Sequence, residues 1–207
     1  MIAQGTEAWL QQRAGKISAS NISKVMAGGK GITRGKHIAK LALERITGSY
    51  IPDFKFSDAD RGNILEPKAR QKYEEINFVG VELEGFVVHP NIPNSGASPD
   101  GLVGDDGLIE IKTRDYHIQF DFIRTGTISD ENMKQMQFQM AVTGRKWCDY
   151  VSYMAVPEEL EDKIPEHLLI KTVRVERDDQ MIKQIEAAVR QADAEIEAMV
   201  KELKGVK

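Results

Sequence analysis

Two carboxylates and an amine within one short segment are the residues of this chain best placed to do chemistry. Nine residues separate Asp100 from Glu110, and Lys112 follows two positions after Glu110. The intervening residues carry a turn signal at 104–107 between two short apolar runs, which predicts a β-hairpin with a tight polar loop. Such a hairpin would bring Asp100 and Glu110 face to face across the ladder.

The alternation of side chains along a strand sorts these residues further. Glu110 and Lys112 should share one side of the strand, while Ile109 and Ile111 point to the opposite, buried side. The three charged groups are therefore predicted to converge at one edge of a sheet.

This convergence suits phosphodiester hydrolysis. Mg²⁺ prefers oxygen ligands, and a carboxylate pair supplies them without expelling all of its water. The ammonium of Lys112 could lower the pKa of the attacking water or neutralise charge that develops in the transition state. The alternative is a surface hairpin with scattered charges, because a carboxylate followed two residues later by Lys occurs at about one position in a hundred by composition.

Three further blocks of sequence, in a fixed order with the first, favour the catalytic interpretation. The four blocks are Trp9 to Ser20, Arg61 to Arg70, Ser98 to Lys112 and Gln135 to Gly144. Together they resemble the motifs of the λ-exonuclease family, the YqaJ-type viral recombinases, over roughly residues 7–144.

The resemblance implies an α/β fold with the restriction-endonuclease-like PD-(D/E)xK core, a central mixed β-sheet flanked by helices. It also implies a 5′→3′ exonuclease that digests one strand of double-stranded DNA from 5′-phosphorylated ends. Two Mg²⁺ ions per active site are expected, with Mn²⁺ as a substitute. Members of the family form ring-shaped trimers around DNA and supply 3′ single strands to a cognate annealing protein.

Site residues follow from the resemblance position by position. Asp100, Glu110, the Ile111 carbonyl and Glu66 match metal ligands, and Lys112 matches the catalytic lysine. Gln137 matches the glutamine beside the nucleophilic water. Arg13 and Ser20 match the residues that hold the terminal 5′-phosphate.

Several of these residues have an ordinary structural alternative. Ser20 could cap a helix that begins near Ile22 and leave Arg13 solvated, although a helix N-terminus also attracts a phosphate. Glu66 could be a first-turn glutamate favoured by the helix dipole, and Pro67 after it either starts a helix or kinks a longer one. Gln137 could be a solvated amide.

Composition indicates one globular domain over residues 1–207, with 41% hydrophobic and 29% charged residues. The chain shows no membrane span or signal sequence and has a single cysteine, Cys148, which predicts a buried strand residue and the reducing cytoplasm of a bacterial host cell. The formal net charge is −4, yet residues 1–50 hold eight Lys and Arg against two Asp and Glu. This positive charge could line a local phosphate track.

Caps and apolar spacing predict the elements that position these residues. The expected helices cover residues 6–13, 20–27, 35–47, 58–76, 130–142 and 178–203. The expected strands cover residues 81–89, 97–103, 108–113, 147–156 and 168–175. The last helix carries an apolar seam from Ile182 to Leu203, for which packing on its own sheet is preferred over a contact with a second subunit.

Two other functions fit the same residues. A site-specific endonuclease could use the same centre, although the chain has no extra domain for reading sequence. A non-catalytic module that binds DNA ends or an annealing partner is also possible, but the intact set of Asp100, Glu110 and Lys112 argues for hydrolysis.

Overall fold

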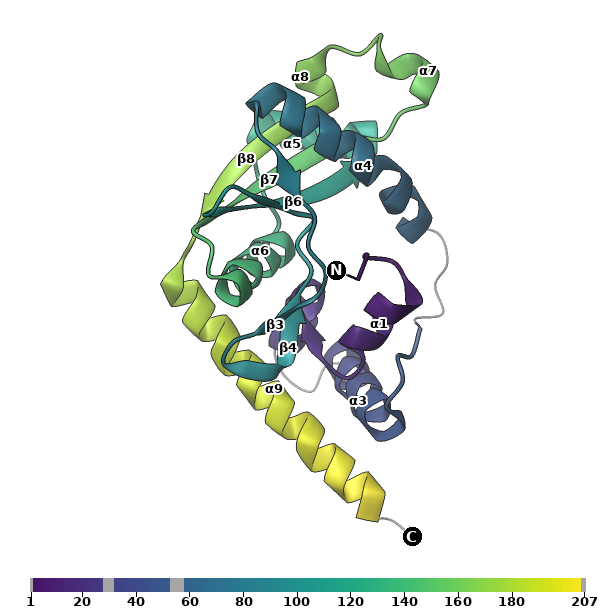
Figure 1. The fold of residues 1–207 in the computed structure, drawn as a ribbon, viewed down its shortest axis with the longest axis vertical. Helices are drawn as coiled ribbons and strands as arrows, with labels where there is room; N and C mark the ends of the chain where they lie inside the picture. The colour runs from purple at the N-terminus through teal and green to yellow at the C-terminus, as the bar shows by residue number, and fades with distance from the viewer. Residues whose placement is uncertain (1, 28–31, 53–57, 206–207) are drawn as a thin grey trace.

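The computed structural model describes residues 2–27, 32–52 and 58–205, with the backbone alone for residues 58–64 (Figure 1). The helices are α1 (Glu7–Arg13), a 3-10 turn η1 (Ala19–Asn21), α2 (Ile22–Met26), α3 (Ile32–Thr47), α4 (Asp58–Asn77), α5 (Tyr116–Thr125), α6 (Asp130–Thr143), α7 (Glu158–Glu161), α8 (Glu166–Leu169) and α9 (Asp179–Gly205). The strands are β1 (Ile17–Ser18), β2 (Val81–Glu82), β3 (Val87–His89), β4 (Ile92–Ala97), β5 (Gly101–Val103), β6 (Gly107–Arg114), β7 (Trp147–Met154) and β8 (Ile170–Glu176). All the predicted helices are confirmed, with ends that differ by three residues or fewer.

A five-stranded mixed sheet is the centre of the fold, with the strand order β2-β5-β6-β7-β8. β5 and β6 form the predicted antiparallel hairpin, in which Gly101 pairs with Ile109 and Val103 with Gly107. β6 and β7 run parallel over eight residue pairs, and β8 returns antiparallel to β7. The residues of the candidate centre therefore lie on or next to a central strand.

A smaller sheet of order β1-β4-β3 lies beside the first. The predictions of single strands over residues 81–89 and 97–103 were wrong, because the chain passes from one sheet to the other within each of them. β4 ends at Ala97 and β5 begins at Gly101, so residues 98–100 join the two sheets. Pro99 lacks the N–H that a continuous ladder needs, which accounts for the break at this point.

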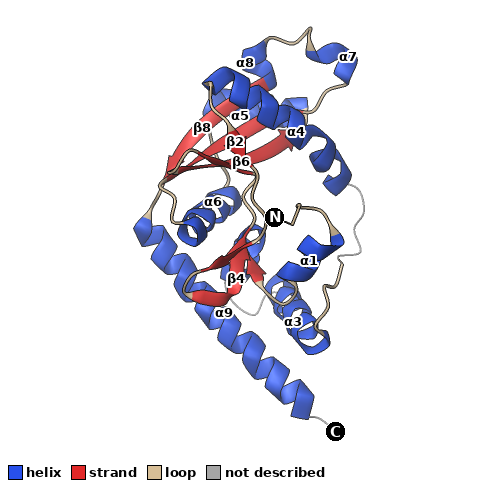
Figure 2. Cartoon of the chain, in the orientation of Figure 1, coloured by secondary structure: helices blue, strands red, loops and turns tan. Residues whose placement is uncertain are grey.

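Helices cover both faces of the larger sheet (Figure 2). The predicted alternation along β6 is confirmed by its packing, since Ile109 and Ile111 share a core cluster with Tyr73 of α4. Leu108 instead shares a cluster with Met136 of α6 and with Cys148, which is fully buried in β7 as predicted. The side of β6 that carries Glu110 and Lys112 thus faces α6.

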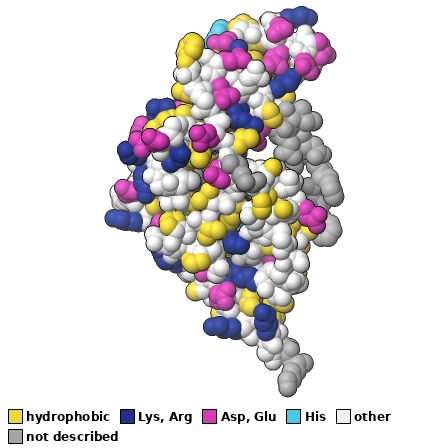
Figure 3. Space-filling model, viewed as in Figure 1, with side chains coloured by type: hydrophobic (Ala, Val, Ile, Leu, Met, Phe, Trp, Pro, Cys, Tyr) yellow, Lys and Arg dark blue, Asp and Glu magenta, His cyan; other side chains and the backbone are white. Residues whose placement is uncertain are grey.

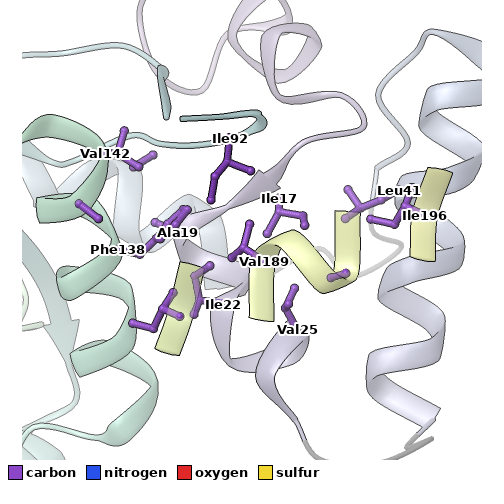
Figure 4. Packing of buried hydrophobic residues seen from close by; sticks show 14 of the residues in the cluster. Ile17, Ala19, Ile22, Val25, Leu41, Ile92, Phe138, Val142, Val189 and Ile196 are labelled. Atoms are coloured by element: carbon purple, nitrogen blue, oxygen red, sulfur yellow. The ribbon is translucent and has the colours of Figure 1, made fainter. Parts of the chain in front are cut away.

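A third cluster packs α2, α3, α6 and α9 around the smaller sheet (Figure 4). The apolar seam of α9 contributes Ile185, Val189 and Ile196, all fully buried. The expected packing of this helix within its own chain is confirmed, mainly against α2, α3 and α6 and to a smaller extent against β4 of the smaller sheet. Leu203 at its end is 52% exposed. Within the described ranges, no helix has both the length and the apolar character needed to cross a membrane.

Candidate active site

Three charged residues meet near the segment of residues 98–100 that joins the smaller sheet to the larger one. Asp100, just before β5, accepts a hydrogen bond from the Ile111 N–H to its Oδ2 at 2.7 Å. Glu110 is 1% exposed, and its Oε1 lies 2.6 Å from the Lys112 Nζ. The hairpin thus brings the two carboxylates and the ammonium together, as the spacing predicts.

Two glutamines of α6 hold the Glu110 carboxylate from the side opposite the backbone. The Gln135 Nε2 donates to Glu110 Oε1 at 2.7 Å, and the Gln139 Nε2 donates to Glu110 Oε2 at 2.7 Å. Both oxygens of a buried carboxylate are therefore satisfied by side-chain donors, which fixes its orientation.

The placement of Gln137 at the centre was wrong. Its Nε2 donates to the Glu176 carbonyl at 2.8 Å and its Oε1 accepts from the Asp178 N–H at 2.8 Å, so the residue ties α6 to the loop that precedes α9. Residues four apart share a helix face, whereas residues two apart do not. Gln135 and Gln139 share the face toward β6, and their spacing was the signal that could have found them.

The charges of the centre influence one another. Burial, followed by the nearby Glu110 and Glu66, raises the pKa of Asp100 well above its ordinary value. Burial opposes the charge of Lys112, but Glu110 and Asp100 outweigh that effect and raise the pKa of its ammonium. A cation bound between these carboxylates would favour their charged forms.

Glu66 lies on α4, which runs through Pro67 without a break. Its Oε1 is 3.0 Å from the Arg70 Nη1, and the same nitrogen donates to the Asp100 carbonyl at 3.2 Å. Arg70 therefore links the α4 carboxylate to the segment that carries Asp100, a connection that sequence reasoning missed.

A cavity of about 230 Å³ connects this centre to the N-terminal region of the chain. Its lining comes from four parts of the molecule: Gln4, Trp9, Arg13, Ser18, Ala19, Ser20, Glu66, Ser98, Asp100, Glu110, Ile111, Lys112 and Gln135. All the sequence-predicted site residues except Gln137 line it. Trp9, Ser18, Ser98 and Gln135 are additions that the structure supplies.

Arg13 occupies one end of this lining. Its Nη2 lies 3.3 Å from the Ser18 Oγ and 3.4 Å from the Ser20 Oγ, and its guanidinium carbon is 4.0 Å from the centre of the Trp9 ring. Burial lowers the pKa of Arg13, with Tyr50 and Glu44 acting in the opposite direction. Among the described residues no carboxylate forms an ion pair with Arg13, so its charge is available to an anion.

The alternative interpretation, in which Ser20 caps a helix that begins near Ile22, was wrong. The N-cap residue of α2 is Asn21, which makes no side-chain capping hydrogen bond, and Ser20 belongs to the preceding η1 turn. Its Oγ lies 3.2 Å from the Ser18 Oγ. The hydroxyls of Ser18 and Ser20 and the guanidinium of Arg13 therefore meet outside the N-terminus of α2.

The predicted phosphate track of residues 1–50 is only partly supported. Arg34 and Arg45 point their guanidinium groups at acidic residues of α9, with N–O distances of 2.7–2.8 Å. Lys30 lies outside the described residues. On the face drawn in Figure 3, acidic side chains gather over the short helices α7 and α8, far from Arg13 in sequence.

The residues of the centre fit a divalent cation by chemistry, though not as a finished coordination shell. Asp100, Glu110 and Glu66 offer hard carboxylate oxygens around one cavity. In the described ranges no three Asp, Glu, His or Cys side chains already meet as a group that could hold a metal ion. Glu110 is engaged with Lys112 and two glutamines, and Glu66 with Arg70, so binding would require these contacts to adjust.

The mixed sheet with an aspartate at the head of a hairpin and a Glu-x-Lys strand beside it defines a nuclease fold of the PD-(D/E)xK class. The family model of the YqaJ-like viral recombinase domain matches residues 8–146, and the chain belongs to this family.

Solved structures agree with this assignment. The alkaline exonuclease LHK-Exo from Laribacter hongkongensis is 42% identical, with 96% of each chain covered and a TM-score of 0.85. The same enzyme in complex with dAMP gives 42% identity, 96% coverage of each chain and a TM-score of 0.84. A phage-related exonuclease from Haemophilus somnus 129PT is 16% identical over 91% of this chain and 96% of its own, with a TM-score of 0.69, and shares the fold. No curated protein matches the chain.

Proposed function

We propose that the protein is a Mg²⁺-dependent 5′→3′ exonuclease that digests one strand of double-stranded DNA from 5′-phosphorylated ends. The 3′ single strands that it leaves would serve phage-type homologous recombination by strand annealing. Membership of the viral recombinase family and 42% identity to an alkaline exonuclease support a nuclease acting on DNA ends.

One observation carries the proposal beyond the family. The same cavity is lined by the Asp100, Glu110 and Lys112 centre and by Arg13 with the hydroxyls of Ser18 and Ser20. An arginine that has no acidic partner among the described residues and lies next to hydroxyl donors suits a phosphate group. A terminal phosphate held there would place the first phosphodiester bonds of the strand toward the carboxylates.

The chain's own residues divide the work of hydrolysis. Lys112, kept protonated by its two carboxylate neighbours, would stabilise negative charge on the phosphate as the bond breaks. Gln135, which lies beside both Glu110 and Lys112, is the glutamine able to position a water at the centre. Gln139 would keep Glu110 in its orientation.

Asp100, Glu110, the Ile111 carbonyl and Glu66 are the groups that would hold Mg²⁺. When bound, two such ions would supply an activated water and neutralise charge on the reacting phosphate, and Mn²⁺ should substitute. The assembly of the chain into a homotrimeric ring around DNA and the delivery of product to a cognate annealing protein in the bacterial cytoplasm belong to the same proposal.

Digestion of linear duplexes that are labelled separately at the 5′ and 3′ ends, with and without Mg²⁺, tests the activity. Covalently closed circles of the same sequence are the matched control substrate. Mg²⁺-dependent release of the 5′ label with circles left intact is the expected result. Cleavage of the circles would indicate an endonuclease instead, and the absence of any cleavage would indicate a binding module.

A further inference from the structure

Gly15 occupies the turn between the two groups proposed to hold the terminal phosphate. It is buried, has a left-handed φ of +69°, and separates Arg13 of α1 from Ser18 of β1. The same turn is closed by the Lys16 N–H, which donates to the Arg13 carbonyl at 3.0 Å. The position of Gly15 therefore sets the position of Arg13 relative to the serine hydroxyls.

Two consecutive residues of α3 form hydrogen bonds with both backbone polar groups of Gly15. The Gly15 N–H donates to Glu44 Oε2 at 2.8 Å, and the Gly15 carbonyl accepts from the Arg45 Nε at 2.8 Å. A Cβ at position 15 would lie 2.7 Å from the Arg45 Cγ, so the contact is close enough to require glycine.

Each of these side chains is itself fixed by a second partner. Glu44 is 2% exposed, and its other oxygen accepts from the Ile51 N–H at 3.0 Å. Arg45 pairs through its two terminal nitrogens with Asp193 and Glu197 of α9, each at 2.7 Å. The turn is thus anchored to α3 and, through Arg45, to the C-terminal helix.

We infer that Glu44 and Arg45 are positioning residues for the recognition of the 5′-phosphate. Neither residue lines the cavity. They act by holding the Gly15 turn so that Arg13 and the hydroxyls of Ser18 and Ser20 face one point. This inference rests on the proposed function, because it assigns the two residues to the end selection of that same site. Binding groups that shift by about 1 Å lose much of their effect, so a loosened turn should weaken selection for the phosphate.

Arg34 gives a matched control on the same helix. Its Nε donates to the Val25 carbonyl at 3.0 Å and its terminal nitrogens pair with Glu195 of α9 at 2.8 and 3.0 Å. It therefore makes the same kinds of bond as Arg45, from α3 to a backbone carbonyl and to α9, but at a place away from Arg13.

The experiment compares Arg45→Lys with Arg34→Lys in the full chain. Lysine can retain an ion pair with α9 but has no Nε–H for the backbone carbonyl. The measurement is the ratio of kcat/KM for 5′-phosphorylated duplex to kcat/KM for 5′-hydroxyl duplex. Arg45→Lys should lower this ratio roughly fivefold, the factor for one ordinary hydrogen bond, while Arg34→Lys leaves it at the wild-type value. Glu44→Gln, which replaces one acceptor oxygen with a donor, should lower it as well.

The outcomes separate this inference from the proposed function. A wild-type enzyme that shows no preference for the phosphorylated end would overturn the phosphate site itself and the inference with it. A wild-type preference that Arg45→Lys and Glu44→Gln both retain would overturn the positioning role alone. An equal fall of the ratio in Arg34→Lys would also overturn it, because that would mark a general effect of loosening α9. If Glu44→Gln does not fold, the comparison of Arg45→Lys with Arg34→Lys still tests the positioning role.

Discussion

Gln139 donates its amide to Glu110 Oε2 at 2.7 Å, while its own Oε1 is buried and has no hydrogen-bond partner among the described residues. A buried acceptor left unpaired costs stability, so Gln139 contributes more to the orientation of Glu110 than to the fold. The relationship indicates that the orientation of the Glu110 carboxylate depends on Gln139.

Replacement of Gln139 by methionine should therefore lower activity much more than stability. The substitution removes the donor that orients Glu110, and loss of such a supporting contact typically costs about 10–100-fold in metal affinity or activity. Calorimetric titration with Mg²⁺ and the rate of 5′-label release test the two effects. Wild-type kinetics in Gln139→Met would contradict the assignment.

Gln137→Met should show the opposite pattern. The change removes two hydrogen bonds that join α6 to the Glu176 and Asp178 backbone, so the free energy of unfolding should fall by about 1–3 kcal/mol. The kcat of the folded enzyme should stay within about twofold of wild type, because these bonds lie away from the cavity. Urea unfolding measures the free energy of unfolding, and steady-state kinetics measures kcat. A large fall in kcat would indicate that Gln137 does act at the centre.

Lys112→Ala should strongly slow cleavage while sparing the binding of DNA. The substitution removes the cation that would stabilise transition-state charge, for which a loss of about 10²–10³-fold in kcat is expected, but it removes no metal ligand. Fluorescence anisotropy with a labelled duplex measures binding apart from cleavage. A parallel loss of affinity would refute the separate role of the lysine.

Arg13→Ala should narrow the rate difference between 5′-phosphorylated and 5′-hydroxyl ends. Arg13 contributes the only guanidinium among the described residues that line the cavity, and a phosphate clamp has no advantage on an end without phosphate. Single-turnover digestion of the two substrates gives the ratio directly. An unchanged ratio would show that Arg13 has a structural role.

His89 should make the protein less stable in mild acid. Burial is the largest effect on the pKa of His89 and lowers it. The nearby Glu186 raises this pKa and Arg190 lowers it, and the net shift is downward. The Nδ1 accepts from the Asn91 N–H at 3.1 Å, and the Nε2 faces Glu186 Oε1 at 3.1 Å, so the folded state favours the neutral ring. Above the ordinary value of 6.5 both states are neutral; below it the unfolded state binds the proton more readily, and the free energy of unfolding falls.

Urea unfolding between pH 7.5 and pH 5.5, on the order of one unit either side of that value, measures this effect. The contribution of His89 to the slope is limited to about 1.4 kcal/mol per pH unit. His89→Gln should flatten the profile over this range. A variant with the wild-type slope would assign the titration to another group.

The sequence predicts which residues meet within the hairpin better than it predicts how the strands are divided between the two sheets. The hairpin of β5 and β6 is specified by alternation and a turn, so Asp100, Glu110 and Lys112 could be brought together without a structure. Whether the segment before Asp100 continues one strand or crosses between two sheets depends on distant partners, and the prediction of one strand was wrong.

The helix face of α6 shows the same limit in another form. The second half of this helix is buried all round, with Gln137, Phe138 and Gln139 each 2% exposed or less, so its apolar pattern does not indicate which side faces the centre. A motif can identify a glutamine-rich helix, but the register of the helix against β6 decides which glutamine serves. Likewise, the pairing of Gly15 with Glu44 and Arg45 joins residues about thirty positions apart, and no local spacing signals it.

The order in which the chain is synthesised determines when the link from Gly15 through Arg45 to α9 can form. Asp100, Glu110 and Lys112 are synthesised before residue 113, whereas Asp193 and Glu197, which hold Arg45, follow much later in the chain. A nascent chain therefore carries its hydrolytic residues well before the contacts that fix the Arg13 turn can form. The contact between α9 and Arg45 thus forms only after the residues proposed to hydrolyse DNA have been synthesised.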